Sequence, residues 1–141
     1  MVELQERGGR PPRALVVEDD ADLREFLVHI LEHRGVECTD AGDAETALEL
    51  AVAGRFDILV TDIKLPGIDG IELRRRLIEL VPGLPAVAVT AYLGAWDRED
   101  LSDFGFSATI RKPLHIPAFL KICLQVIQDA NRSPTQTSLP I

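Results

Sequence analysis

The chain contains few cysteines and no long apolar run. Only two of its 141 residues are cysteines, Cys38 and Cys123, and no CxxC pair or secretory apolar segment occurs. This pattern argues against a disulfide framework and predicts two buried free thiols in a reducing compartment. No apolar stretch approaches the roughly 20 residues that a membrane-spanning helix needs. We therefore expect a cytoplasmic protein without a membrane partner.

Basic residues are also scarce, because 15 Lys and Arg stand against 23 Asp and Glu, for a net charge of −8. Such a charge opposes a phosphate backbone, so direct binding of nucleic acid through a broad basic surface is not expected. A chain of this length with 46% hydrophobic residues suits one domain. We expect that domain over residues 13–131, between a flexible segment at 1–12 and a flexible, Ser/Thr/Pro/Gln-rich tail at 132–141.

Short β-branched apolar runs alternate with helical patterns along the chain. Strands are expected at about 13–17, 36–40, 57–61, 86–90 and 107–111. The helices between them show apolar stripes, such as Leu73, Leu77 and Leu80, and a last stripe that begins at Ile116. Five such alternations predict a three-layer, doubly wound α/β fold with a five-stranded parallel sheet. The flavodoxin-like order 2-1-3-4-5 is the expected solution.

Polar residues follow four of these strands at the point where each strand ends. They are Glu18-Asp19, Asp62, Thr90 and Lys112. Taken alone, each could be a helix cap, a turn residue, a strand residue or a surface lysine. In an open parallel sheet, however, the carboxyl ends of the strands border one crevice. Carboxylates there suit Mg²⁺, while lysine and threonine suit anionic oxygens, so the pattern predicts a site for a hard cation and a phosphoryl group.

The same residues carry a family resemblance that runs from about Ala14 to about Asn131. Glu18-Asp19, Asp62 in the sequence VTDIKLPGIDG, Thr90-Ala91 and Lys112-Pro113 occur in one order. Together they resemble the receiver domain of two-component response regulators. The resemblance is nearest to receivers that stand alone or belong to hybrid kinases.

The resemblance implies a role for each site residue. Asp62 would accept the phosphoryl group, with Thr90 and Lys112 as its partners in catalysis. Mg²⁺ would be held by Asp19, Asp62 and the backbone carbonyl of Lys64, with Glu18 acting through water. The family also implies a cis peptide bond between Lys112 and Pro113.

The implied function is signalling. A histidine kinase or histidine phosphotransfer protein would supply the phosphoryl group, and the modified domain would change its affinity for a downstream protein target. The domain would catalyse only its own phosphorylation and dephosphorylation, as a monomer or a phosphorylation-dependent dimer. A stand-alone regulator, a phosphorelay shuttle and a receiver excised from a hybrid kinase remain alternatives.

Two features bear on the switch and on the lifetime of the phosphoryl group. Thr109 occupies the position where the family often has an aromatic residue, so the output could instead depend on the fourth helix with Tyr92 and Trp96. Lys64 and Tyr92, each two positions beyond a site residue, are expected to shield an aspartyl phosphate from water.

Three other functions compete with signalling. A receiver-like interaction module that is never phosphorylated is the main competitor. A phosphohydrolase with an Asp nucleophile is disfavoured because Lys64 stands where such enzymes need a second acid. A flavin-binding electron carrier is disfavoured because the acidic first turn, at Glu18-Asp19, would repel the cofactor phosphate.

Overall fold

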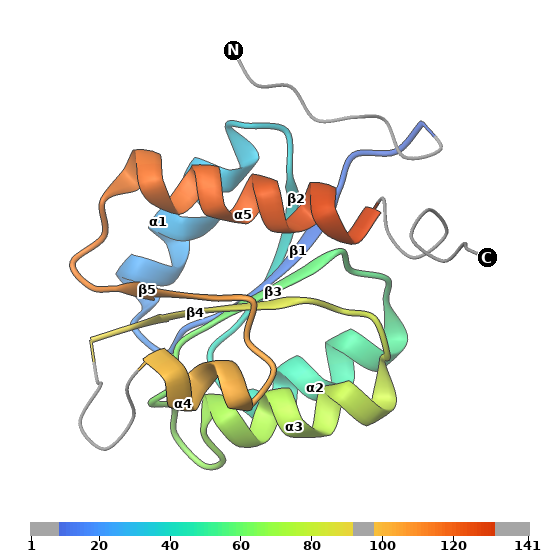
Figure 1. The fold of residues 1–141 in the computed structure, drawn as a ribbon. Helices are drawn as coiled ribbons and strands as arrows, with labels where there is room; N and C mark the ends of the chain where they lie inside the picture. The colour runs from blue at the N-terminus through green and yellow to red at the C-terminus, as the bar shows by residue number, and fades with distance from the viewer. Residues whose placement is uncertain (1–8, 92–97, 132–141) are drawn as a thin grey trace.

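The computed structural model describes residues 9–91 and 98–131, which form a single parallel sheet between two layers of helices (Figure 1). The strands are β1 (Arg13–Val17), β2 (Glu37–Ala41), β3 (Ile58–Thr61), β4 (Ala86–Thr90) and β5 (Ala108–Arg111). The helices are α1 (Ala21–Glu32), α2 (Ala44–Ala53), α3 (Gly70–Leu80), α4 (Arg98–Asp103) and α5 (Ile116–Asn131). The strand order is β2-β1-β3-β4-β5 with every pairing parallel, so the predicted fold and order are confirmed.

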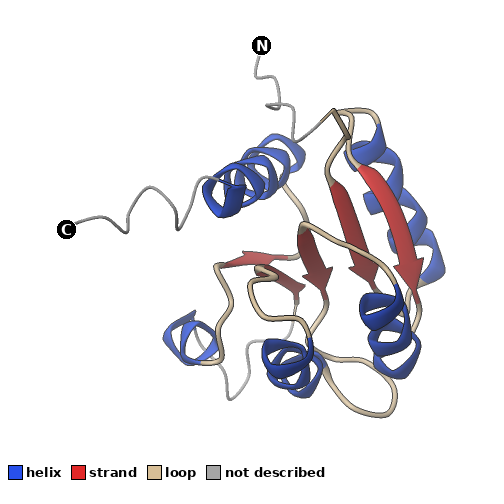
Figure 2. Cartoon of the chain, turned by 90° about the vertical axis from the view of Figure 1, so that its right-hand side faces the viewer, coloured by secondary structure: helices blue, strands red, loops and turns tan. Residues whose placement is uncertain are grey.

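Each face of the sheet has its own apolar core. On β1, Leu15 and Val17 belong to the core under α2, α3 and α4, whereas Ala14 and Val16 belong to the core under α1 and α5. Figures 1 and 2 show the same division, with α1 and α5 on one side of the sheet and the other helices opposite. Because both faces of β1, β3 and β4 are covered, the sequences of these three strands are mostly apolar instead of alternating.

Aspartates begin three of the helices. Asp20 caps α1 by accepting from the backbone N–H groups of Asp22 and Leu23, while Asp43 caps α2 and Asp69 caps α3. A short carboxylate side chain satisfies the backbone donors that a helix leaves unpaired in its first turn. Asp20 is therefore the N-cap residue of α1.

Two predicted core positions prove to be exposed. Leu80 is 55% exposed and Ile116 is 39% exposed, although their helices bury the other residues of each stripe. Leu80 ends α3 and Ile116 begins α5, so both lie at helix ends. Helical periodicity assigns a residue to a face of the helix, but it does not show where the sheet beneath that face stops.

Both cysteines are free thiols. Cys123 is fully buried on α5, as predicted, but Cys38 is only half-buried because β2 is an edge strand. Burial raises the pKa of each thiol to about 12, so neither is a thiolate at neutral pH. Among the helices of the described ranges, none has the length and apolarity to cross a bilayer.

Candidate functional site

The sheet brings the four predicted strand ends to one edge. The backbone N–H of Asp62 donates to the Val17 carbonyl at 3.0 Å, so the ends of β1 and β3 lie side by side. On the other side, the N–H of Lys112 donates to the Thr90 carbonyl at 3.1 Å and joins β5 to β4. The resulting cleft of about 430 Å³ is lined by Glu18, Asp19, Asp20, Asp62, Lys64, Leu65, Pro66, Thr90, Ala91 and Lys112.

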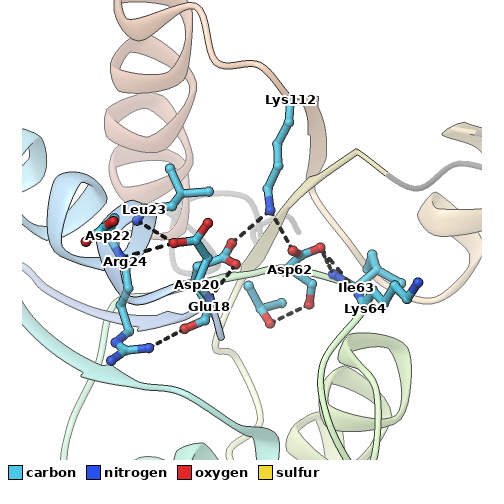
Figure 3. A network of polar contacts seen from close by, with 10 residues as sticks. Glu18, Asp20, Asp22, Leu23, Arg24, Asp62, Ile63, Lys64 and Lys112 are labelled. Atoms are coloured by element: carbon cyan, nitrogen blue, oxygen red, sulfur yellow. Dashed lines mark hydrogen bonds and ion pairs between the residues drawn. The ribbon is translucent and has the colours of Figure 1, made fainter.

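The side chain of Lys112 joins two of the acids across this cleft (Figure 3). Its Nζ donates to Asp62 Oδ2 at 2.7 Å and to Glu18 Oε1 at 3.0 Å. Burial works to lower the pKa of Lys112, but the hydrogen bonds to the two carboxylates outweigh it and raise the pKa above its usual value. Lys112 is therefore a firmly charged cation beside Asp62. The Lys112-Pro113 peptide bond that precedes α5 is cis, as predicted.

Both carboxylate oxygens of Asp62 accept hydrogen bonds. While Oδ2 binds Lys112, Oδ1 accepts from the backbone N–H of Ile63 at 2.6 Å and from that of Lys64 at 3.3 Å. The residue is only 6% exposed. These contacts orient the carboxylate of Asp62 into the cleft.

Glu18 is the most deeply buried acid of the site, at 1% exposure. Burial raises the pKa of Glu18, and the charge of Asp62 adds to this shift, while hydrogen bonds from Lys112 and from the Asp20 N–H oppose it. Its Oε2 accepts from the Asp20 N–H at 3.1 Å. Glu18 thus supports the start of α1, but its other oxygen faces Lys112 and Asp62.

The acidic residues fit a divalent cation. Glu18, Asp19 and Asp62 each offer a carboxylate oxygen, and these oxygens lie within 4.8 Å of one another. Three convergent carboxylates provide the hard oxygen ligands that Mg²⁺ requires. Asp19 is exposed at the mouth of the cleft, whereas Thr90 is fully buried at the end of β4. All of the predicted site residues therefore lie around one cleft, and their chemical roles stay predictions.

Thr109 and Arg24 are not among the residues that line the cleft. Tyr92 and Trp96 fall outside the described residues. Thr109 is half-buried on β5, opposite Ala88 on β4. Sequence reasoning missed Arg24, which binds the backbone carbonyl of Glu18. An arginine in the first turn of a helix, where the helix dipole disfavours positive charge, was the available signal.

Fold and site define a doubly wound α/β domain whose sheet edge carries three acids and a bridging lysine. Comparison with known proteins identifies the family of this domain. The family model of the response regulator receiver domain matches residues 14–123. The chain belongs to the response regulator receiver domain family.

Individual relatives agree with this assignment. The chain is 36% identical over 104 residues to the response regulator receiver protein CpdR of Brucella abortus, covering 74% of this chain and 87% of CpdR. For several other curated relatives, it spans only about half of their length.

Solved structures show the same fold. A CheY-like receiver domain protein from Methanospirillum hungatei is 28% identical with a TM-score of 0.80, over 86% of this chain and 98% of that one. The response regulator protein TrrA from Thermotoga maritima, in complex with Mg(2+)-BeF, is also 28% identical. Its TM-score is 0.75, over 82% of this chain and 98% of that one. Receiver domains are signalling domains that bind Mg²⁺ through acidic residues and interact with histidine kinases or phosphotransfer proteins.

Proposed function

We propose that this receiver domain accepts a phosphoryl group on Asp62 from a phosphohistidine of a histidine kinase or histidine phosphotransfer protein. The supporting observation is the ammonium of Lys112, which lies 2.7 Å from Asp62 and 3.0 Å from Glu18. A cation in this position can bind the oxygens of a phosphoryl group that arrives at Asp62.

In the proposed transfer, a carboxylate oxygen of Asp62 attacks the phosphorus atom. The N–P bond of the phosphohistidine breaks, and the imidazole nitrogen keeps the electron pair. Lys112 binds the phosphoryl oxygens, and the hydroxyl of Thr90 donates to one of them from the end of β4. No other acceptor of the phosphoryl group is needed.

Mg²⁺ fits the same cleft. Glu18, Asp19 and Asp62, together with the backbone carbonyl of Lys64, are the groups that would hold it. When bound, the ion would neutralise the crowded carboxylates and polarise the phosphoryl oxygens. The complex of TrrA with Mg(2+)-BeF supports this part of the proposal, because TrrA shares the fold.

The proposed output is a change of affinity for a downstream protein target in the cytoplasm. The domain, over residues 13–131, would act as a monomer or a phosphorylation-dependent dimer, without direct binding of nucleic acid. It would turn over no separate substrate and would catalyse only its own phosphorylation and dephosphorylation.

Intact mass spectrometry tests the proposal. The native protein, treated with a small phosphodonor and Mg²⁺, should gain the mass of one phosphoryl group, and excess chelator should prevent the gain. Asp62→Asn, which keeps the shape of the side chain, should show no gain. Equal phosphorylation of Asp62→Asn would refute the assigned acceptor, and no gain in the native protein with any donor would favour an unphosphorylated interaction module.

A further inference from the structure

Arg24 reaches from the first turn of α1 back to the loop that follows β1. Its Nη1 donates to the backbone carbonyl of Glu18 at 2.6 Å, as Figure 3 shows. Its Nε donates to Asp40 Oδ2 at 2.9 Å, near the end of the neighbouring strand β2. One guanidinium therefore joins the acidic loop, α1 and β2.

Local helix energetics do not explain this arginine. A positive charge in the first turn is unfavourable next to the helix dipole, and Asp20 already caps the helix. The ion pair with Asp40 is also partly solvated, since 47% of the Asp40 side chain is exposed. Such a pair contributes little to stability. The contact with the Glu18 carbonyl is the feature of Arg24 that needs a role.

The space for the guanidinium depends on a missing side chain. A Cβ built on Gly42 would lie 3.2 Å from Nη1 of Arg24. A side chain at position 42 would therefore press on the guanidinium, which would have to shift by a few tenths of an ångström.

The bound carbonyl belongs to the peptide group between Glu18 and Asp19. Because a peptide group is planar, fixing its carbonyl also fixes the direction of the bond from the peptide nitrogen to the Cα of Asp19. The orientation of this peptide group matters more for Asp19 than for the other two acids. Glu18 and Asp62 are held through their side chains, but the Asp19 carboxylate has no hydrogen bond or ion pair within residues 9–91 and 98–131.

We propose that Arg24 is a positioning residue for the divalent cation site. With Asp40 as its anchor, it holds the Glu18–Asp19 peptide group so that the Asp19 carboxylate faces those of Glu18 and Asp62. The inference rests on the proposed Mg²⁺ site, and it concerns Mg²⁺ affinity before any phosphoryl transfer.

Isothermal titration calorimetry with Mg²⁺ alone tests the proposal. Arg24→Ala should raise the dissociation constant about tenfold or more, as expected when a partner that orients a metal ligand is lost. Gly42→Ala and Asp40→Asn keep the arginine but displace or release it, so each should weaken Mg²⁺ binding by a smaller factor. These two variants keep the test decisive if Arg24→Ala does not fold.

Arg75→Ala is the matched control, because Arg75 forms an ion pair with Glu72 on the exposed side of α3, away from the cleft. It should bind Mg²⁺ as the native protein does. Native-like Mg²⁺ affinity in Arg24→Ala, Gly42→Ala and Asp40→Asn would overturn the role of Arg24.

The variant Asp19→Asn distinguishes a failure of the role of Arg24 from a failure of the proposed Mg²⁺ site. If the native protein binds Mg²⁺ and Asp19→Asn weakens that binding, the cation site stands, and the Arg24 variants decide the inference. If Asp19→Asn binds as the native protein does, or if the native protein does not bind, the proposed site and the role of Arg24 both fall.

Discussion

At the scale of single residues, Gly70 lies close against the backbone of Asp62, the proposed acceptor. A Cβ added at Gly70 would lie 2.2 Å from the Asp62 carbonyl oxygen and 2.9 Å from Ile63 Cα. Backbone atoms cannot rotate aside as a side chain can, so the loop must move. We expect Gly70→Ala to lower the free energy of unfolding by about 1–3 kcal/mol, as overpacking does. Urea denaturation measures this, and unchanged stability would contradict it.

Gly83→Ala is a suitable comparison for Gly70→Ala. Its added methyl group would meet no atom within 4 Å, but Gly83 has a φ of +92°. The expected decrease in the free energy of unfolding of Gly83→Ala, about 1–2 kcal/mol, should therefore come from the left-handed backbone conformation alone. Of these two variants, only Gly70→Ala should also slow phosphorylation, because Gly70 lies against the backbone of Asp62 and Gly83 does not.

We expect Lys64 to affect how long a phosphoryl group on Asp62 would persist. Its side chain is exposed at the cleft, where it can bind phosphoryl oxygens but cannot orient an attacking water as an amide can. We expect Lys64→Asn to speed dephosphorylation several-fold. First-order loss of the phosphoryl mass at fixed Mg²⁺ measures the rate, and unchanged or slower loss would dismiss the shielding role. The partner predicted for this role, Tyr92, lies outside the described residues.

At the scale of elements, the buried Arg74 on α3 binds the loop before β4 and the loop between α4 and β5. Its Nη1 donates to the Leu84 carbonyl at 2.5 Å, before β4. Its Nε and Nη2 donate to the Gly105 carbonyl at 3.2 and 3.0 Å, between α4 and β5. Burial lowers the pKa of Arg74, since the charged form loses hydration, yet its carbonyl partners keep the donors satisfied.

Arg74→Met should therefore be strongly destabilising. It keeps an apolar stem but leaves two carbonyls without their donor, at a cost of about 1–3 kcal/mol for each. Urea denaturation measures the loss, with Arg75→Ala on the exposed side of the same helix as the control. If both variants unfold at the same urea concentration, Arg74 does not hold these segments together.

At the scale of the whole molecule, the proposed cation site would couple Mg²⁺ binding to folding. Asp62 lies 43 residues beyond Asp19 along the chain, so the unfolded state does not hold the three carboxylates together, and Mg²⁺ should bind the folded state preferentially. Such binding adds about 2.7 kcal/mol to the free energy of unfolding at a ligand concentration 100 times the dissociation constant. We expect Mg²⁺ to raise the melting temperature, and a chelator to reverse the rise. Asp19→Asn at matched ionic strength should show no rise, and an equal rise there would contradict the prediction.

Several features of this protein could be predicted from its sequence because they depend on local pattern. Short apolar runs identified the strands, and apolar stripes at helical spacing identified helices. Polar residues at strand ends then indicated a cleft, because a parallel sheet brings those ends to one edge. The motifs at Asp62 and Lys112 indicated the receiver family.

Contacts between distant segments were decided only by the tertiary structure. The bridge from Lys112 to Glu18 spans 94 residues, and the Arg74 bond to Gly105 spans 31. Arg24 and Gly70 have no local pattern that shows which carbonyl each one approaches. Leu80 satisfies the helical period yet lies exposed at a helix end. Local sequence determines which face a residue takes, whereas the packing of helices on the sheet determines what that face meets.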